Sequence, residues 1–148
     1  RKVIEVSNAD LTQAFDDRTL ASALLEPTRI YVKSVLVLLK TVPVHALAHI
    51  TGGGLPGNIS RIIPDGLCAV IESQSWKLPP VFNWIQENGN IREDEMLKTF
   101  NCGMGMAIAV APADAPAVIK SLESSGESAW LAGRVEKVDT GSDRVRIL

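Results

Sequence analysis

The pattern of apolar and polar residues is typical of helices in some segments of the chain and of strands in others. Apolar side chains recur every three or four positions across residues 30–40, which predicts a largely buried helix. Short apolar runs predict strands at residues 44–50 and 67–71. Because proline is favoured in the first turn of a helix, another helix is expected from about Pro56 to Ile63. A strand, a glycine-rich loop and a helix therefore follow one another directly.

The remaining pattern completes an alternating order of elements. Further helices are predicted at residues 1–6, 20–25, 79–88, 92–98 and 113–124. Strands are predicted at residues 102–111, 129–138 and 144–148, and the last two are expected to form an antiparallel hairpin around the turn at 139–142. The polar stretch from Ser7 to Thr19 carries no predicted element. This order predicts an α+β layered domain with a mixed sheet.

Composition narrows the class of protein. The 148 residues suit one domain, with 46% hydrophobic residues, 22% charged residues and a formal charge of -2. No basic excess is available to follow a nucleic-acid backbone, so we expect no nucleic-acid partner. The longest apolar runs fall far short of the roughly 20 residues that span a bilayer, and no secretory signal precedes them. We therefore expect a cytoplasmic protein with no membrane partner.

The start of the chain and its two cysteines add further expectations. Residues 1–6 read as the middle of an amphipathic segment without a cap or an initiating methionine, which indicates a piece of a longer protein. Cys68 and Cys102 lie far apart and form no CxxC pair, so both are expected to be buried thiols. The acidic runs at 16–17 and 93–95 are interpreted as solvated structural acids, the second at a helix N-terminus.

The glycine-rich loop is the strongest candidate for a binding site. Thr51 is followed by Gly52, Gly53 and Gly54, and glycine allows backbone N–H groups to approach an anion closely. Thr51 can add a hydroxyl, Asn58 an amide and Arg61 a guanidinium fork suited to phosphate. The alternative is a tight strand-to-helix turn with Arg61 in solvent.

A dinucleotide site is a weaker interpretation of the same loop. Gly52, Gly54 and Gly57 formally satisfy G-x-G-x-x-G, and Glu72 lies near the distance of a ribose-binding acid. However, the Leu-Pro pair at 55–56 disturbs the opening of the helix, and no later β-α repeats complete a doubly wound sheet. The loop also lacks the G-K-[ST] of a phosphate-binding P-loop.

Two histidines four residues apart raise the question of a metal. His45 and His49 have no evident third ligand, so no metal site is predicted. His49 precedes the glycines by two residues and is a tentative catalytic candidate, as a hydrogen-bond donor or proton shuttle. Gly103 and Gly105 interrupt a predicted strand, which indicates close approach of another backbone or a ligand. From residues alone, the chain is a ligand-binding half-site.

Five ordered blocks are spread over most of the sequence: LEPTRIYVK at 25–33, HITGGG at 49–54, NISR at 58–61, PVFNW at 80–84 and EMLKTFNCGMGM at 95–106. Together they resemble the C-terminal half of the phosphoribosylformylglycinamidine cyclo-ligases, also called aminoimidazole ribonucleotide synthetases. The resemblance implies a three-layer α/β/α domain with a mixed sheet that is partly ferredoxin-like.

The same resemblance implies a function. In this family formylglycinamidine ribonucleotide is closed to aminoimidazole ribonucleotide with release of ADP and phosphate, using ATP and Mg²⁺, in purine biosynthesis. An N-terminal half, not contained in this chain, carries the ATP-binding groups and the homodimer barrel, and the active site lies in a cleft between the halves. The chain alone is therefore expected to be inactive and to bind neither ATP nor Mg²⁺ tightly.

By position, the resemblance suggests which residues meet the substrate. Thr51, Gly52, Gly53 and Gly54 are candidates for contacting a phosphate, with Asn58 and Arg61 in support and His49 beside them. Asn101, Gly103 and Gly105 are expected to line the same cleft, unless the glycines serve close packing. Thr28, Arg29 and Tyr31 are expected to face the N-terminal domain, although Arg29 can equally pair with a local acid. The alternative function is a free-standing phosphate- or nucleotide-binding module without catalysis.

Overall fold

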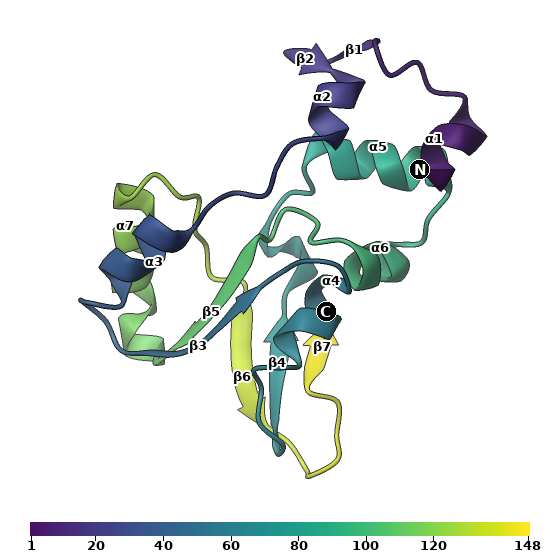
Figure 1. Cartoon of the computed structure of the whole chain (residues 1–148). Helices are drawn as coiled ribbons and strands as arrows, with labels where there is room; N and C mark the ends of the chain where they lie inside the picture. Colours follow the sequence, from purple (N-terminus) through teal and green to yellow (C-terminus); the bar gives the residue numbers. More distant parts are fainter.

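The strands form two main sheets in the computed structural model, which describes residues 1–148 (Figure 1). Strand β3 (Val44–His49) pairs antiparallel with β5 (Met106–Val110), ending with His49 opposite Met106. Strand β4 (Leu67–Ile71) is the centre of a second sheet, antiparallel to β6 (Gly133–Lys137) and parallel to β7 (Val145–Ile147). The predicted α+β class with a mixed sheet is confirmed.

The predicted terminal hairpin is wrong, because β6 and β7 lie on opposite sides of β4 instead of pairing with each other. Residues Cys68 to Ile71 of β4 are all buried, so this strand is enclosed on both faces and needs a partner on both edges. At one end of the ladder β6 approaches so closely that a Cβ on Gly133 would lie 1.9 Å from the carbonyl oxygen of Val70. Glycine is therefore required there.

Helices flank the strands on two sides. Helices α3 (Val32–Leu38) and α7 (Ala115–Ser124) pack together on one side, and α4 (Gly54–Ile59) and α6 (Glu93–Thr99) pack together on the other (Figure 1). Short 3₁₀ helices occur at η1 (Ser73–Ser75) and η2 (Pro112–Asp114). Strand β3 leads through α4 to β4, and β5 leads through α7 to β6. The β3–β5 pairing follows ferredoxin-like order, whereas β4 and β6 pair with each other.

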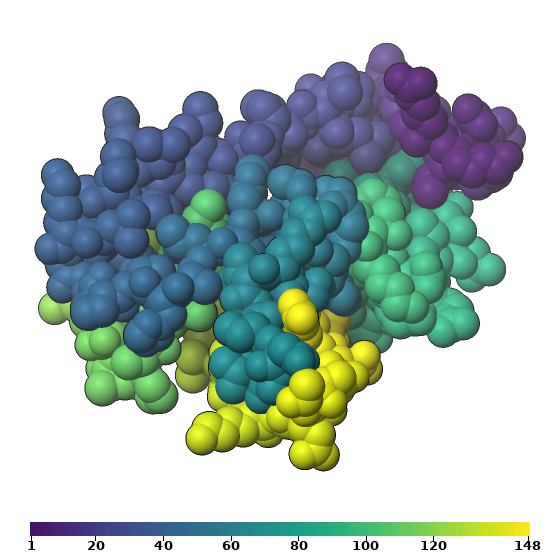
Figure 2. Space-filling model, turned by 60° about the horizontal axis from the view of Figure 1, so that its bottom comes forward, coloured from purple at the N-terminus to yellow at the C-terminus, as the bar shows by residue number.

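The N-terminal segment lies along the periphery. Helix α1 (Lys2–Ser7) packs on α5 (Pro80–Gly89), and a small hairpin of β1 (Ala14–Phe15) and β2 (Arg18–Thr19) leads into α2 (Leu20–Leu24). Figure 2 shows this purple-to-blue segment extending along one side of the molecule as far as α3. The hairpin was not predicted, because its strands are two residues long and its turn depends on a left-handed Asp16 with φ of 52°.

Helix α3 is not largely buried, contrary to the expectation from its apolar spacing. Only Ser34 and Leu38 are buried, on the side facing α7. Val32 and Leu36 keep 60% and 53% of their surface exposed. Periodicity identified the helix but could not show that the chain covers only one narrow face of it.

Two predicted boundaries also differ from the structure. The helix expected from Pro56 begins at Gly54 and ends at Ile59. The strand expected from residue 102 begins at Met106, because Cys102 and Gly103 have left-handed φ angles of 49° and 93° and form a turn. Both cysteines are buried free thiols, as predicted.

The main core fills the space between α4, α6 and the inner faces of the strands. Its fully enclosed side chains include those of Ile50, Leu55, Ile59 and Met96. Ala48 and Ile50 point into this core, so the alternation of a strand sends His49 and Thr51 outward. None of the helices has the length and apolar character needed to cross a membrane.

Candidate functional site

The connector between α2 and α3 lies over the end of β3 and contacts the His49 imidazole. The Thr28 hydroxyl lies 3.3 Å from His49 Nε2, within hydrogen-bonding distance. The Tyr31 ring meets the imidazole edge-on, with 5.9 Å between ring centroids. Thr28 and Tyr31, which are expected to face the N-terminal domain, thus both contact the candidate catalytic histidine.

Gly105 leaves room for Tyr31. A Cβ on Gly105 would lie 1.7 Å from the Tyr31 hydroxyl oxygen, so the phenol occupies the space of the missing side chain. Burial raises the pKa of the Tyr31 hydroxyl, and the Glu127 carboxylate acts in the same direction. Close packing, the alternative considered for this glycine, therefore accounts for it.

Arg29 anchors the connector to the loop after α7. Its Nε lies 2.7 Å from Glu127 Oε2, and its Nη2 donates to the carbonyl of Gly126 at 2.6 Å. The other carboxylate oxygen of Glu127, whose side chain is only 11% exposed, accepts from Ser34 Oγ at 2.5 Å. Arg29 thus pairs with a local acid, Glu127, which was one of the two expectations for this residue. The ion pair holds the connector in place.

A pocket of about 310 Å³ opens beside His49. Its apolar walls come from the connector, from α3 and from β5, and the residues that line it are Arg29, Ile30, Tyr31, Val32, Val35, His49 and Met106. No local pattern indicated this pocket, since the apolar spacing of residues 30–40 predicted a buried helix. A mixed apolar and imidazole lining is typical of sites for small organic molecules.

The three loop glycines have different environments. Gly52 and Gly53 are exposed, whereas Gly54 is buried against α6. A Cβ on Gly54 would lie 2.0 Å from the carbonyl oxygen of Leu97, and its φ of 58° is left-handed. Gly54 therefore serves helix packing, and the surface offered to a ligand consists of Thr51, Gly52 and Gly53.

Asn58 stabilises the glycine loop from its buried side. Its side chain is buried, and its Nδ2 donates to the carbonyls of Thr51 at 3.2 Å, Gly52 at 3.4 Å and Gly54 at 2.8 Å. In a planar trans peptide the N–H points away from the preceding carbonyl. The N–H groups of Gly52 and Gly53 consequently face outward, and neither donates a hydrogen bond within the chain. Asn58, predicted as a supporting ligand contact, orients the loop through these hydrogen bonds.

Arg61 stands next to this loop without an acidic partner. It is exposed, it forms none of the chain's ion pairs, and its Nη1 lies 3.5 Å from Asn58 Oδ1. The Thr51 hydroxyl reaches the same oxygen at 3.4 Å. A guanidinium without an acidic partner, beside two free N–H groups, provides positive electrostatic potential and hydrogen-bond donors, which together suit an oxyanion.

The turn between α6 and β5 adjoins the end of β3, since the N–H of Ile50 donates to the carbonyl of Gly105 at 2.9 Å. Asn101 Oδ1 accepts from the N–H of Gly103 at 3.1 Å, so this side chain is engaged within its own turn. A Cβ on Gly103 would lie 2.7 Å from the Pro79 ring. Local turn geometry and packing account for Asn101 and Gly103, while the backbone of Gly103 stays exposed.

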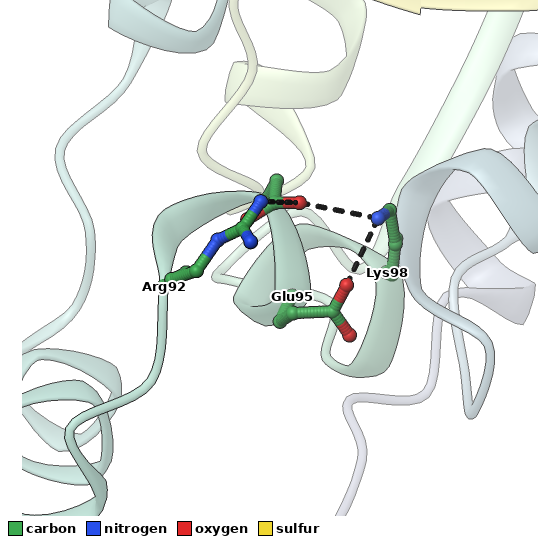
Figure 3. Close-up of polar contacts among 4 residues, drawn as sticks. Arg92, Glu95 and Lys98 are labelled. Carbon is green, nitrogen blue, oxygen red and sulfur yellow. Dashed lines mark hydrogen bonds and ion pairs between the residues drawn. The ribbon is translucent and has the colours of Figure 1, made fainter.

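The acidic run at the start of α6 is structural. Lys98 Nζ lies 2.9 Å from Glu95 Oε1 and 3.2 Å from Asp94 Oδ2, and Arg92 also pairs with Asp94 (Figure 3). The hydrogen bond from Lys98 lowers the pKa of the Asp94 carboxyl. The interpretation of 93–95 as solvated structural acids is confirmed. No group of three His, Cys, Asp or Glu side chains in the chain is arranged to hold a metal ion.

Taken together, the fold and the site define a class: an α+β domain that presents an exposed glycine loop and an adjacent apolar pocket at the end of one strand. Residues 1–146 match the family described as AIR synthase related protein, C-terminal domain. The chain therefore belongs to this family of C-terminal domains, as its sequence blocks indicated.

Proposed function

We propose that the chain is the C-terminal domain of an ATP-dependent cyclo-ligase that converts formylglycinamidine ribonucleotide to aminoimidazole ribonucleotide. Thr51, Gly52 and Gly53, with Arg61, bind the phosphate of this substrate, and His49 hydrogen-bonds beside it. In this proposal ATP would supply the phosphoryl group that turns the formyl oxygen into a leaving group. The amidine nitrogen would then bond to the formyl carbon as the C–O bond breaks and the oxygen leaves as phosphate. The contribution of this domain is to position the substrate for that closure.

The observation that carries the proposal is the outward orientation of two unpaired N–H groups beside a guanidinium that has no acidic partner. The buried Asn58 amide maintains this orientation before any ligand arrives, which lowers the ordering cost of binding. Added Cβ atoms on Gly52 and Gly57 would find nothing within 4 Å. The loop is thus both accessible and preorganised.

ATP and Mg²⁺ belong, in this proposal, to the N-terminal half of the full-length protein. Mg²⁺ takes oxygen ligands, mainly carboxylates and phosphates. The acids near α6 are neutralised by Lys98 and Arg92, and no cluster of acids lies at the glycine loop. We therefore propose that the N-terminal half supplies the protein ligands for Mg²⁺.

The exposed apolar residues of the connector and α3 support a contact with that half. Ile30 is 81% exposed and Val32 is 60% exposed, and both flank the His49 pocket. Side chains of this kind gain stability when another surface covers them. The proposal places the N-terminal half over this side of the molecule, with the full-length protein as a cytoplasmic homodimer.

Reconstitution tests the proposal. The chain is mixed with a separately expressed ATP-binding half of a family member, and ADP release is measured with formylglycinamidine ribonucleotide. Arg61→Ala should raise KM for the ribonucleotide by roughly tenfold or more, because a charge-assisted phosphate contact is lost. Arg144→Ala is the matched control, since Arg144 is also exposed and forms no ion pair.

Inactivity of a properly assembled pair would count against the cyclo-ligase assignment. Tight binding of ribose 5-phosphate by the chain alone, unchanged when the ATP-binding half is added, would favour a free-standing binding module instead. Equal kinetics for Arg61→Ala and Arg144→Ala would remove Arg61 from the phosphate site.

A further inference from the structure

Strand β6 leaves one of its two edges without a partner strand. It lies at the margin of the three-stranded sheet, with β4 on one side only, while β3 and β5 form a separate sheet (Figure 1). Val135, in the middle of β6, is 47% exposed. An unpaired edge presents backbone N–H and C=O groups with which another strand can pair. This edge is therefore a surface for strand addition.

The hydrogen bonds to β4 show which backbone groups of β6 are free. At one end of the ladder, the N–H of Val138 donates to the carbonyl of Gly66 at 3.0 Å. At the other end, the N–H of Glu72 donates to the carbonyl of Ala132 at 2.9 Å. Because hydrogen-bonded pairs alternate along antiparallel strands, the even-numbered residues of β6 bond to β4. The backbone groups of Val135 consequently point to the open edge, and the same holds for Gly133 and Lys137.

The side chains beside Val135 form a row of alternating charges. Arg134 lies 2.9 Å from Glu72 and 2.7 Å from Glu136, which in turn lies 4.0 Å from Arg146. Arg134 and Glu136 are two positions apart and hence on one face of the sheet. The row contains as many acids as arginines, so a second molecule can approach it without net repulsion.

A second copy of β6 fits this edge when it runs antiparallel with the two Val135 residues opposite each other. The two valines would then exchange backbone hydrogen bonds, since their free groups point the right way. Arg134 of each copy would lie directly opposite Glu136 of the other, where opposite charges stabilise strand pairing. Lys137 would lie opposite Gly133, so no like charges would meet. The order Arg-Val-Glu is therefore complementary to itself.

We infer that two copies of the chain associate through their β6 edges into one continuous antiparallel sheet. Self-complementary charges favour a second copy over an unrelated strand, because a two-fold contact uses the same surface on both molecules. The inference is independent of the proposed phosphate site. Strands of five residues offer less contact than the roughly 1,200 Å² of stable interfaces. The dissociation constant should therefore be about 0.1–1 mM.

Sedimentation velocity of the 148-residue chain, from about 10 μM to 1 mM, measures this association. Val135→Pro removes an N–H that faces away from β4, so the sheet should survive while association weakens about tenfold or more. Val145→Pro is the matched control on the far edge. The N–H of Leu148 donates to the carbonyl of Ile71, so the N–H of Val145 faces away from β4 on the β7 side. This control should associate like the wild type, and circular dichroism checks the fold of both variants.

Charge reversal provides a second test that does not depend on proline. Arg134→Glu places acids opposite each other in the paired strands, and Glu136→Arg places arginines opposite each other. Neither variant should associate alone at about 1 mM, whereas an equal mixture should associate at least as tightly as the wild type, because acids then face arginines. Arg146→Glu makes the same charge change on the same face but on β7, and it should associate like the wild type.

A wild-type chain that stays monomeric at about 1 mM would overturn the inference. Association that persists in Val135→Pro would place the contact elsewhere, for example on the exposed apolar side of α3, and would also overturn it. If Val135→Pro does not fold, the mixture decides: tighter association of the two charge variants together than of either alone supports pairing through β6, and no gain on mixing refutes it.

Discussion

Three consecutive glycines with different surroundings allow a quantitative test of the loop. An alanine Cβ at Gly54 would lie 2.0 Å from Leu97 O and 2.8 Å from Leu97 C, and the φ of 58° is left-handed. At Gly53 the φ is 95°, but the nearest atoms are 3.9 Å away. At Gly52 nothing lies within 4 Å, and its φ is not in the left-handed region.

These surroundings predict a graded loss of stability. A left-handed alanine costs about 1–2 kcal/mol, and overpacking adds about 1–3 kcal/mol when the obstacle is backbone. Gly54→Ala therefore combines both terms, for a loss of about 3 kcal/mol or more as α4 separates from α6. Gly53→Ala should lose about 1–2 kcal/mol from its φ alone. Gly52→Ala should stay within about 0.5 kcal/mol of the wild type.

Urea unfolding followed by tryptophan fluorescence measures these differences, since the chain contains three tryptophans. A thermal melt gives an independent scale, on which Gly54→Ala should lower Tm by about 10 °C. Phosphate binding should show a different order, because Gly52→Ala places a methyl group beside the outward N–H groups. We expect this variant to fold normally and to bind ribose 5-phosphate more weakly.

Equal stability of Gly54→Ala and Gly52→Ala would show that the contact with α6 does not constrain the loop. A Gly52→Ala chain that is stable and binds ribose 5-phosphate like the wild type would refute the assignment of the outer loop face to the phosphate.

Two further predictions concern buried groups. Asn58→Ala should lower the free energy of unfolding by about 1–3 kcal/mol, because three carbonyls lose their shared donor. Hydrogen exchange of the amides in residues 51–54 should become faster for the same reason. Unchanged exchange would show that the amide does not hold the loop. Burial raises the pKa of the Cys102 thiol from 9.0 to about 11, so the folded state keeps a proton that the unfolded state releases above pH 9. The stability of the wild type should therefore fall relative to Cys102→Ala between pH 9 and pH 11, by up to about 3 kcal/mol, and parallel pH profiles in urea unfolding would contradict this.

The sequence predicted which elements form more reliably than how they pair. Strand β4 was identified by its unbroken apolar run, and the helices by their spacing and prolines. The hairpin error has a physical cause: the turn at 139–142 is compatible with a hairpin, but the fully buried Val70 requires a neighbour on each edge of β4. Whether a strand needs a partner on each edge depends on its position in the assembled sheet. The local pattern of residues does not show this position.

The candidate site was predicted in part for similar reasons. The glycine loop and Arg61 could be located from spacing, because a strand, glycines and a helix are local features. The role of Asn58 could not, since its burial depends on how α4 packs. Tyr31 and His49 are 18 positions apart, and only the path of the connector brings their rings within 5.9 Å. The missing side chain of Gly105 was the one local sign of that contact.

The central position of β4 also shapes how the chain folds. Cys68 pairs with Glu136 and Ala69 pairs with Val145, so both edges of this strand are closed by residues on the order of seventy positions away. Contacts at such separation form slowly, because a long loop must close first. Until then an apolar strand has two open edges, and such edges promote aggregation. Refolding yield should consequently fall as protein concentration rises, even though the finished strand is buried and paired on both edges.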